Sequence, residues 1–203
     1  MSHIAVIGAS GEVGSRIVKE LSDRHHQITA ISRHPENIPS LPGVTALKAD
    51  LYNTDEIVQL LKGHDAVVSA VKFVDADAQQ IIDVVKQSGV QRYLVVGGAG
   101  SLEVQPGLLL IDTPEFPEVF KTEATKGAEF LDEIQKETNL NWTFLSPSAL
   151  LGPGERTGKF RLGKDTLLTT GSGSHISYED YAVALVDEIE NPQHPRQRFT
   201  VGY

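Results

Sequence analysis

The feature that most constrains the fold is a glycine-rich turn near the start of the sequence. A short strand-like run, His3 to Ile7, leads into Gly8-Ala9-Ser10-Gly11-Glu12-Val13-Gly14, and a stretch of helical periodicity follows. Gly8 permits a tight turn, Gly11 lets a ligand approach the backbone, and Gly14 lets the helix pack closely on the strand. The helix N-terminus then offers free N–H groups to an anion. The turn predicts a dinucleotide site, and the alternative is a glycine turn that only joins a strand to a helix.

Strand-like and helical stretches alternate along most of the chain. β-Branched runs and amphipathic stretches follow one another as far as a sixth predicted strand at Trp142 to Leu145. This alternation predicts an α/β fold with a Rossmann-type doubly wound parallel sheet. After Pro147 the composition shifts to Gly, Pro, Ser and Thr, and a strand is expected at Thr166 to Thr170. We expect one domain over residues 1–203, with a Rossmann core at 1–146 and a small C-terminal substrate-side lobe at 147–203.

Charge and composition exclude several classes of partner. The formal net charge is −9 and no basic stripe is visible, so we expect no nucleic-acid partner. No apolar stretch approaches the roughly 20 residues that span a bilayer, and the first residues do not resemble a signal peptide. We therefore expect no membrane partner and a cytoplasmic location. The chain has no cysteine and its histidines are scattered, so we assign no metal site.

The end of the second predicted strand indicates which dinucleotide is bound. NAD sites usually place an acidic residue on the ribose about 20 residues beyond the glycine turn. Here the strand ends in Ser32 and Arg33. A guanidinium forms a bidentate pair with a 2′-phosphate, and Ser32 can donate a further hydrogen bond. The sequence thus favours NADP(H) over NAD(H), unless Arg33 is only a solvated surface residue.

Two more strand ends are expected beside the same cofactor. Asp50 and Leu51 follow the third strand, where such folds bring a side chain to the adenine edge. Ala70 and Val71 end the fourth strand, beside the ribose. A purely structural role for these four residues agrees equally well with the sequence.

Several segments together resemble a known family. They are Gly8 to Gly14, Val95 to Ser101, Trp142 to Pro147, Gly154 to Gly158 and Arg198 to Tyr203. Over nearly its whole length the chain resembles the NADH-flavin reductase family of atypical short-chain dehydrogenases, which is related to NmrA-like and biliverdin-reductase-B-like proteins. The resemblance implies a Rossmann-type fold and NAD(P)H binding. It also implies FMN or FAD as a substrate rather than as a bound prosthetic group.

The catalytic tyrosine of the wider superfamily has no counterpart in this sequence. Conventional members use a Ser with a Tyr-x-x-x-Lys pair, in which the tyrosine protonates a carbonyl oxygen. No tyrosine here has a lysine four positions later, and the corresponding helix has Thr122 in the tyrosine's place but keeps Lys126. A threonine hydroxyl is too weak an acid, which favours an acceptor that delocalises charge, such as a flavin or a quinone. Lys126 is then expected on the nicotinamide ribose, or else on the surface near Glu123 and Glu129.

The fifth and sixth strands end in further site candidates. Gly97 and Gly98 follow the fifth strand and are expected to border the nicotinamide, and Ser101 is expected to donate to the substrate, as a catalytic candidate together with Lys126. Pro147 and Ser148 follow the sixth strand and are expected to wall the nicotinamide and the substrate. A flexible strand exit or a plain turn is the alternative at both places.

Arg156 lies in a later glycine-rich loop and is a candidate for binding the substrate. Its guanidinium matches a phosphate in geometry, so we expect it to hold an anionic group such as a flavin phosphate. Pairing with Glu155 or Asp165 is equally compatible with the sequence.

Together these features predict an NADPH-dependent oxidoreductase that passes hydride to a flavin or similar conjugated small molecule. The alternative is a non-enzymatic NADP(H)-binding redox sensor of the NmrA-like type, which also needs no general acid. A sugar-nucleotide epimerase or dehydratase ranks last, because the C-terminal part is small and the tyrosine is missing. The sequence leaves the oligomeric state open between a monomer and a homodimer.

Overall fold

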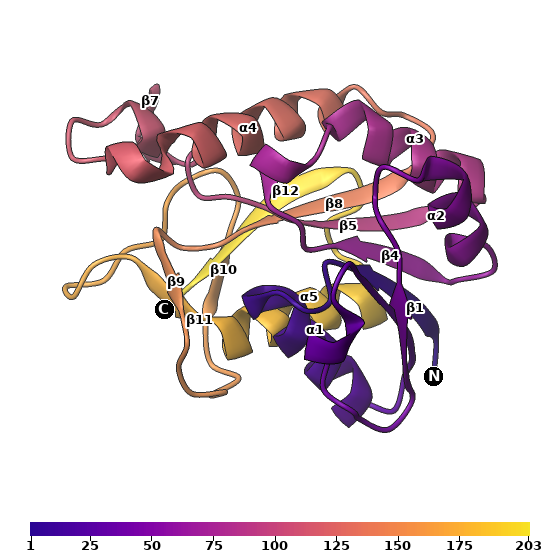
Figure 1. Cartoon of the computed structure of the whole chain (residues 1–203). Coiled ribbons are helices and arrows are strands. Elements are labelled where there is room, and N and C mark those ends of the chain that lie inside the picture. Colours follow the sequence, from indigo (N-terminus) through magenta and orange to yellow (C-terminus); the bar gives the residue numbers. More distant parts are fainter.

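A single eight-stranded sheet forms the centre of the molecule, with helices on both faces (Figure 1). The computed structural model describes all 203 residues. Seven strands are parallel and the edge strand β10 is antiparallel to its neighbour. In spatial order the strands are β10 (Arg161–Gly163), β12 (Gln197–Gly202), β8 (Asn141–Ser146), β5 (Arg92–Val96), β4 (Ala66–Ser69), β1 (His3–Ile7), β2 (Gln27–Ser32) and β3 (Val44–Lys48). The predicted doubly wound α/β class is confirmed.

Two helix layers cover the sheet, because every helix has one apolar side to bury. One face carries α1 (Glu12–Asp23) and α5 (Tyr178–Glu190), which pack together. The other face carries α2 (Thr54–Leu61), α3 (Ala78–Ser88) and α4 (Glu118–Gln135). A hydrophobic core lies on each face of the sheet, and β1 contributes to both of them. Ile4 and Val6 point to one face, while Ala5 and Ile7 point to the other. No helix is both long enough and apolar enough to cross a membrane.

The order of the strands reverses beside β1. The chain proceeds from β1 to β2 and β3 on one side, then crosses to β4 on the other side of β1 and continues to β5 and β8. Open α/β sheets bind ligands at the carboxyl ends of the strands where the order reverses. The fold therefore predicts a ligand site at the carboxyl ends of β1 and β4.

The C-terminal part belongs to the same core. Strand β12 pairs in parallel with β8, and α5 packs on α1. Phe199 and Val201 of β12 are buried in the same core as Ile4 of β1 and Ile17 of α1. The expected division at residue 147 is therefore not a boundary within the sheet. The shorter segments that lie outside the sheet are β9 (Leu150–Gly152) paired with β11 (His175–Ser177), the hairpin of β6 (Glu103–Gln105) and β7 (Leu108–Leu109), and the 3₁₀ turns η1 (Pro35–Asn37), η2 (Phe73–Asp75) and η3 (Leu110–Asp112).

The strand expected at Thr166 to Thr170 was wrong. The segment makes only isolated bridges, from Thr166 to Glu103 and from Thr170 to Gly173. The second of these closes a tight turn with backbone hydrogen bonds in both directions. The edge strand forms earlier, at β10, where Leu162 pairs with Val201.

Candidate functional site

The glycine turn after β1 has the geometry that its spacing predicts. Gly8 has a φ of +81°, and a Cβ there would lie 2.5 Å from the carbonyl oxygen of Ala70. A Cβ on Gly14 would lie 2.2 Å from the carbonyl oxygen of Gly8, so α1 can approach β1 only with glycine at that position. Gly11 differs, because its Cβ would meet nothing closer than 3.4 Å. The protein itself thus leaves the space above Gly11 open.

Free backbone donors surround this space. The N–H groups of Ser10, Glu12 and Val13 have no acceptor within the chain, whereas that of Gly11 bonds to Gly8. They lie at the N-terminus of α1, where the helix dipole adds partial positive charge. The turn therefore has both the donors and the open space that a pyrophosphate group requires.

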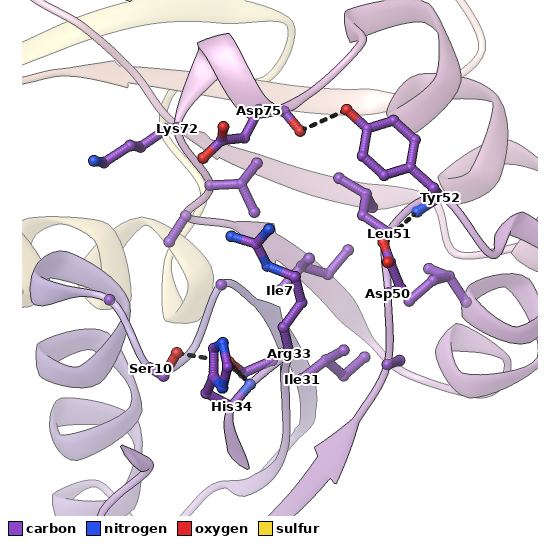
Figure 2. A pocket seen from close by; sticks show the side chains of 17 residues that line it. Ile7, Ser10, Ile31, Arg33, His34, Asp50, Leu51, Tyr52, Lys72 and Asp75 are labelled. Atoms are coloured by element: carbon purple, nitrogen blue, oxygen red, sulfur yellow. Dashed lines mark hydrogen bonds between the residues drawn. The ribbon is translucent and has the colours of Figure 1, made fainter. Parts of the chain in front are cut away.

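A pocket of about 260 Å³, here called the first pocket, lies beside the turn at the carboxyl ends of β1, β2, β3 and β4 (Figure 2). It brings together nine of the residues predicted for the cofactor: Gly8, Ser10, Gly11, Ser32, Arg33, Asp50, Leu51, Ala70 and Val71. Ala9 is buried beneath it, and Glu12, Val13 and Gly14 lie just beyond it in α1. The remaining lining residues are Ile7, Ile31, His34, Ala49, Tyr52, Ile57, Lys72 and Asp75.

Basic side chains are prominent in the first pocket. Figure 2 shows Arg33 extending toward its centre, with Tyr52 and Asp75 on one side and Ser10 and His34 on the other. His34 lies 3.1 Å from Glu36, whereas Arg33 and Lys72 have no ion-pair partner in the chain. Two cations are therefore available to an anionic ligand.

The Ser32 hydroxyl already makes two hydrogen bonds within the chain. Its hydroxyl lies 2.6 Å from that of Ser10 and accepts a hydrogen bond from the N–H of His34 at 3.0 Å. The side chain is buried and links the end of β2 to the glycine turn. Arg33, which points away from these contacts, is the freer of the two predicted phosphate ligands.

Tyr52 and Lys72 are lining residues that the sequence reasoning missed. The Tyr52 hydroxyl donates to the carbonyl oxygen of Asp75 at 3.1 Å, and its N–H bonds to Asp50 at 3.0 Å. The tyrosine remains 65% exposed, so one ring face is available to an adenine. Both residues directly follow positions that were predicted, Leu51 and Val71, and this adjacency was the available signal.

A second pocket of about 400 Å³ lies at the carboxyl ends of β5 and β8. It includes four predicted residues: Gly97, Gly98, Pro147 and Ser148. The other lining residues are Phe73, Ala99, Gly100, Leu110, Thr113, Glu115, Phe116, Pro117, Phe120, Glu123, Ala124, Ala149, Leu150 and Leu151. Gly97 is required here, because a Cβ would lie 2.3 Å from the ring of Phe144.

Most polar side chains of the second pocket are already engaged. The hydroxyl of Ser148 donates to Val201 at 3.0 Å, and that of Thr113 donates to Leu110 at 2.8 Å. The Ser148 side chain is 1% exposed and faces β12. The pocket thus offers no free hydroxyl to protonate a substrate.

Glu123 connects the two pockets. Its carboxylate accepts hydrogen bonds from the N–H groups of Phe73 at 2.8 Å and Val74 at 2.9 Å. These residues form η2, which contributes Asp75 to the first pocket and Phe73 to the second. Helix α4 therefore fixes the segment that separates the pockets.

The two predicted catalytic residues do not line either pocket. The Ser101 hydroxyl accepts a hydrogen bond from Arg198 at 3.1 Å, and Arg198 is also paired with Asp165. Lys126 lies on the exposed side of α4, 2.7 Å from Glu129, and this hydrogen bond raises the pKa of the lysine. Lys126 is thus a surface lysine paired with Glu129, which is the alternative that the sequence left open.

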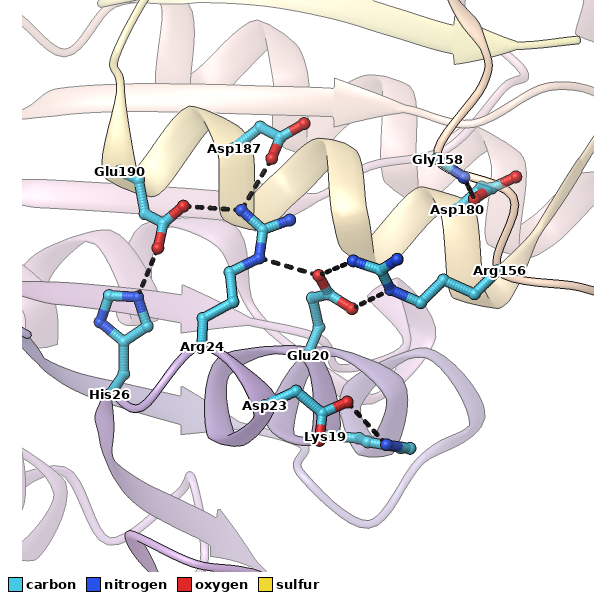
Figure 3. Close-up of polar contacts among 10 residues, drawn as sticks. All are labelled: Lys19, Glu20, Asp23, Arg24, His26, Arg156, Gly158, Asp180, Asp187 and Glu190. Carbon is cyan, nitrogen blue, oxygen red and sulfur yellow. Dashed lines mark hydrogen bonds and ion pairs between the residues drawn. The ribbon is translucent and has the colours of Figure 1, made fainter.

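Arg156 is also apart from the pockets. Figure 3 shows its guanidinium on Glu20 of α1, with hydrogen bonds of 2.7 and 2.8 Å. Arg24 contacts the same carboxylate at 2.8 Å. Burial opposes ionisation of Glu20, but the bonds from Arg156 and Arg24 outweigh it and hold the pKa of the carboxyl below its ordinary 4.5. The partner of Arg156 within the chain is therefore Glu20, and not Glu155 or Asp165.

The sequence model of a family described as NAD(P)H-binding matches residues 8–192. The chain belongs to this NAD(P)H-binding family. The match includes the glycine turn, the whole second pocket and the first pocket except for Ile7, and the fold is that of NAD(P)H-binding oxidoreductases. The free N–H groups, the open space at Gly11 and the unpaired Arg33 and Lys72 all fit a dinucleotide phosphate. No group of three or more His, Asp or Glu side chains is arranged to hold a metal ion.

Several relatives match this chain over nearly its whole length. An uncharacterized Bacillus subtilis (strain 168) protein, YwnB, is 40% identical over 98% of this chain and 97% of its own length. A solved Bacteroides thetaiotaomicron structure, named as a putative epimerase, is 45% identical with a TM-score of 0.94 over 100% of this chain and 97% of that one. A Streptococcus pneumoniae TIGR4 structure, named as a putative NADH-flavin reductase, is 37% identical with a TM-score of 0.85 over 100% and 99% of the two chains. The predicted resemblance to an NAD(P)H-binding family is confirmed, and a structure named as a putative NADH-flavin reductase is among the similar ones.

Proposed function

We propose that the protein is an NADPH-dependent reductase that passes hydride to a flavin or similar conjugated small molecule. The observation that carries the proposal is the pairing of two adjoining pockets at one edge of the sheet. The first has free N–H donors and two unpaired cations, and the second is mainly apolar. This division suits a phosphorylated cofactor whose nicotinamide reaches toward a ring-shaped acceptor.

The preference for NADPH rests on Arg33. An exposed arginine without an ion-pair partner stands where NAD sites usually carry an acid. Lys72, across the pocket, adds a second cation. In the proposed complex the N–H groups of Glu12 and Val13 hold the pyrophosphate and Arg33 holds the 2′-phosphate.

The second pocket supports a conjugated acceptor. When bound, NADPH supplies the hydride. Reduction of an unactivated ketone would need an acid to protonate the alkoxide, and the hydroxyls of Ser148 and Thr113 are engaged elsewhere. A flavin-like acceptor delocalises the charge and takes its proton from water. The residues of this pocket then act by orienting the acceptor. Direct roles for Ser101 and Lys126 are not part of the proposal, because neither lines the pocket.

A second candidate function is an NADP(H)-responsive sensor that does not turn over. The exposed apolar residues Val119, Phe120 and Leu150 favour it, because they lie at or near the mouth of the second pocket, where a partner protein would contact them. A sensor and a reductase differ in whether NADPH is consumed.

The test is the anaerobic rate of NADPH oxidation by purified protein with a flavin acceptor in excess. NADH, an Arg33→Ala variant and a Lys159→Ala control are measured in parallel. Lys159 is an exposed residue outside both pockets. Flavin-dependent turnover that prefers NADPH, and that loses this preference only in Arg33→Ala, supports the proposal. NADPH binding without transfer to any acceptor contradicts it and favours the sensor.

A further inference from the structure

The second pocket has no basic residue in its lining. None of its 18 lining residues is Lys, Arg or His. The first pocket, at the same sheet edge, has Arg33, His34 and Lys72. Any phosphate carried by a ligand in the second pocket would therefore find no cationic side chain there.

The charges that the second pocket does have are negative. Glu115 and Glu123 line it, and Glu123 is held by the two N–H groups of η2. Glu115 is exposed and has no ion-pair partner, so its negative charge is free to repel an anionic ligand at the mouth of the second pocket. Asp112 and Glu118 flank it in sequence, and the nearby Lys121 lies 3.6 Å from Glu118. This mouth repels an anion.

The walls of the pocket suit a flat apolar ring. Phe73, Phe116 and Phe120 supply three aromatic side chains. Phe120 is 59% exposed and Leu150 is 70% exposed, although both are large and apolar. A planar ligand between such side chains would remove apolar surface from water at the mouth.

We propose that the acceptor is an uncharged, fused-ring conjugated molecule, and that the second pocket selects against acceptors that carry a phosphate. This inference rests on the proposed reductase function and narrows its substrate class. The acceptor gains the two electrons and the hydrogen of one hydride from NADPH, together with one proton from water, and NADPH becomes NADP⁺. Flavins that have the same ring but different side chains isolate the effect of charge.

The experiment compares lumiflavin and riboflavin, which are uncharged, with FMN, which carries a phosphate. Anaerobic kcat/KM is measured with NADPH at low and high salt. We expect the uncharged flavins to exceed FMN by about three- to tenfold at low ionic strength, and the gap to narrow as salt screens the mouth. Binding of each flavin to the NADP⁺-loaded protein, followed by flavin fluorescence, is expected to give the same order without turnover.

A charge-reversal pair locates the effect. Glu115→Lys is expected to raise kcat/KM and affinity for FMN relative to those for riboflavin, so that the gap between the two flavins narrows. Asp132→Lys is the matched control, because Asp132 is exposed on α4, lies outside the pocket and has no partner in the chain. It makes the same change in net charge and is expected to leave both flavins unchanged.

The outcomes separate this inference from the function on which it rests. If no acceptor is reduced although NADPH binds, the reductase proposal fails, and the binding order of the flavins still decides the selectivity. If FMN binds or reacts as well as riboflavin at low salt, the selectivity is wrong and the reductase stands. If Phe120→Asp changes the mass in solution but leaves riboflavin binding unchanged, the mouth is a subunit contact and the proposed acceptor site is wrong.

Discussion

The two pockets share one edge of one sheet but differ in how they treat charge. The first is surrounded by free N–H groups and the unpaired cations Arg33 and Lys72. The second has aromatic walls and only carboxylates for charged groups. A Rossmann-type sheet can thus place an anion site and an apolar site side by side, because each strand end contributes its own short set of residues.

The pockets also differ in the interactions that fix their shape. Backbone packing fixes the first, since Gly8 and Gly14 bring α1, β1 and β4 closer than any side chain would allow. Loops and α4 build the second, with Glu123 holding η2 by two hydrogen bonds. Substitutions in the glycine turn and in the first pocket are therefore expected to have the larger effects.

The largest effect is expected for Gly14→Ala. A Cβ there would lie 2.2 Å from the Gly8 carbonyl oxygen, and we expect overpacking to cost at least about 3 kcal/mol of unfolding free energy, measured by urea denaturation. Gly11→Ala is the contrast, because its Cβ has room in the free protein. It should leave the unfolding free energy within about 1 kcal/mol and raise the Kd for NADPH at least about tenfold. Equal loss of stability in both variants would contradict the assignment of Gly11 to ligand approach.

Arg33→Ala tests the cation of the first pocket. We expect it to weaken NADPH binding by about 1.5–3 kcal/mol, roughly ten- to a hundredfold in Kd, while NADH binding stays unchanged. Lys72→Ala is expected to have a smaller effect in the same direction. Isothermal titration of both cofactors measures it, and a parallel loss for NADH would show that Arg33 does not contact the 2′-phosphate.

Arg156→Gln is expected to affect stability rather than cofactor binding, because Arg156 pairs with the buried Glu20. We expect a loss of about 1–2 kcal/mol at neutral pH, as Arg24 still contacts the carboxylate. The folded pKa of Glu20 is lowered, so the pairing stabilises the protein above about pH 4.5 and the effect is lost as the pH falls below it. Urea unfolding at several pH values should show the two proteins converging in acid. A weaker affinity for FMN without a change in the unfolding free energy would contradict this structural role and favour a role for Arg156 in substrate binding.

The smallest effect is expected for Glu123→Gln. The amide oxygen can still accept a hydrogen bond but carries no charge, so we expect the unfolding free energy to fall by about 0.5–1.5 kcal/mol. Because η2 lines both pockets, the KM for NADPH and the KM for the acceptor should both rise. Glu129→Gln, on the exposed side of the same helix, is the control. A change confined to one substrate would show that Glu123 does not couple the pockets.

Local spacing made the first pocket predictable. The three glycines, Arg33 and the ends of the third and fourth strands were all read from position relative to predicted strands, and the structure brings them together. Tyr52 and Lys72 were missed because nothing in one sequence shows which way a loop side chain points.

Long-range partners explain what the sequence could not reveal. Arg156 bonds to Glu20, which lies 136 positions away, and Ser101 bonds to Arg198, 97 positions away. Neither pairing has a local pattern. The edge strand was misplaced for the same reason, since β10 is defined by its pairing with β12 rather than by its own composition.

The assignment of the first pocket to the phosphorylated half of NADPH is tested most directly by a titration with fragments that reach only this pocket. Isothermal titration of the protein with adenosine 2′,5′-bisphosphate and with adenosine 5′-monophosphate isolates the 2′-phosphate from the nicotinamide and from the second pocket. We expect the bisphosphate to bind at least about tenfold more tightly than the monophosphate, to compete with NADPH and to lose this advantage in Arg33→Ala. Equal affinity for the two fragments in the wild-type protein would contradict it.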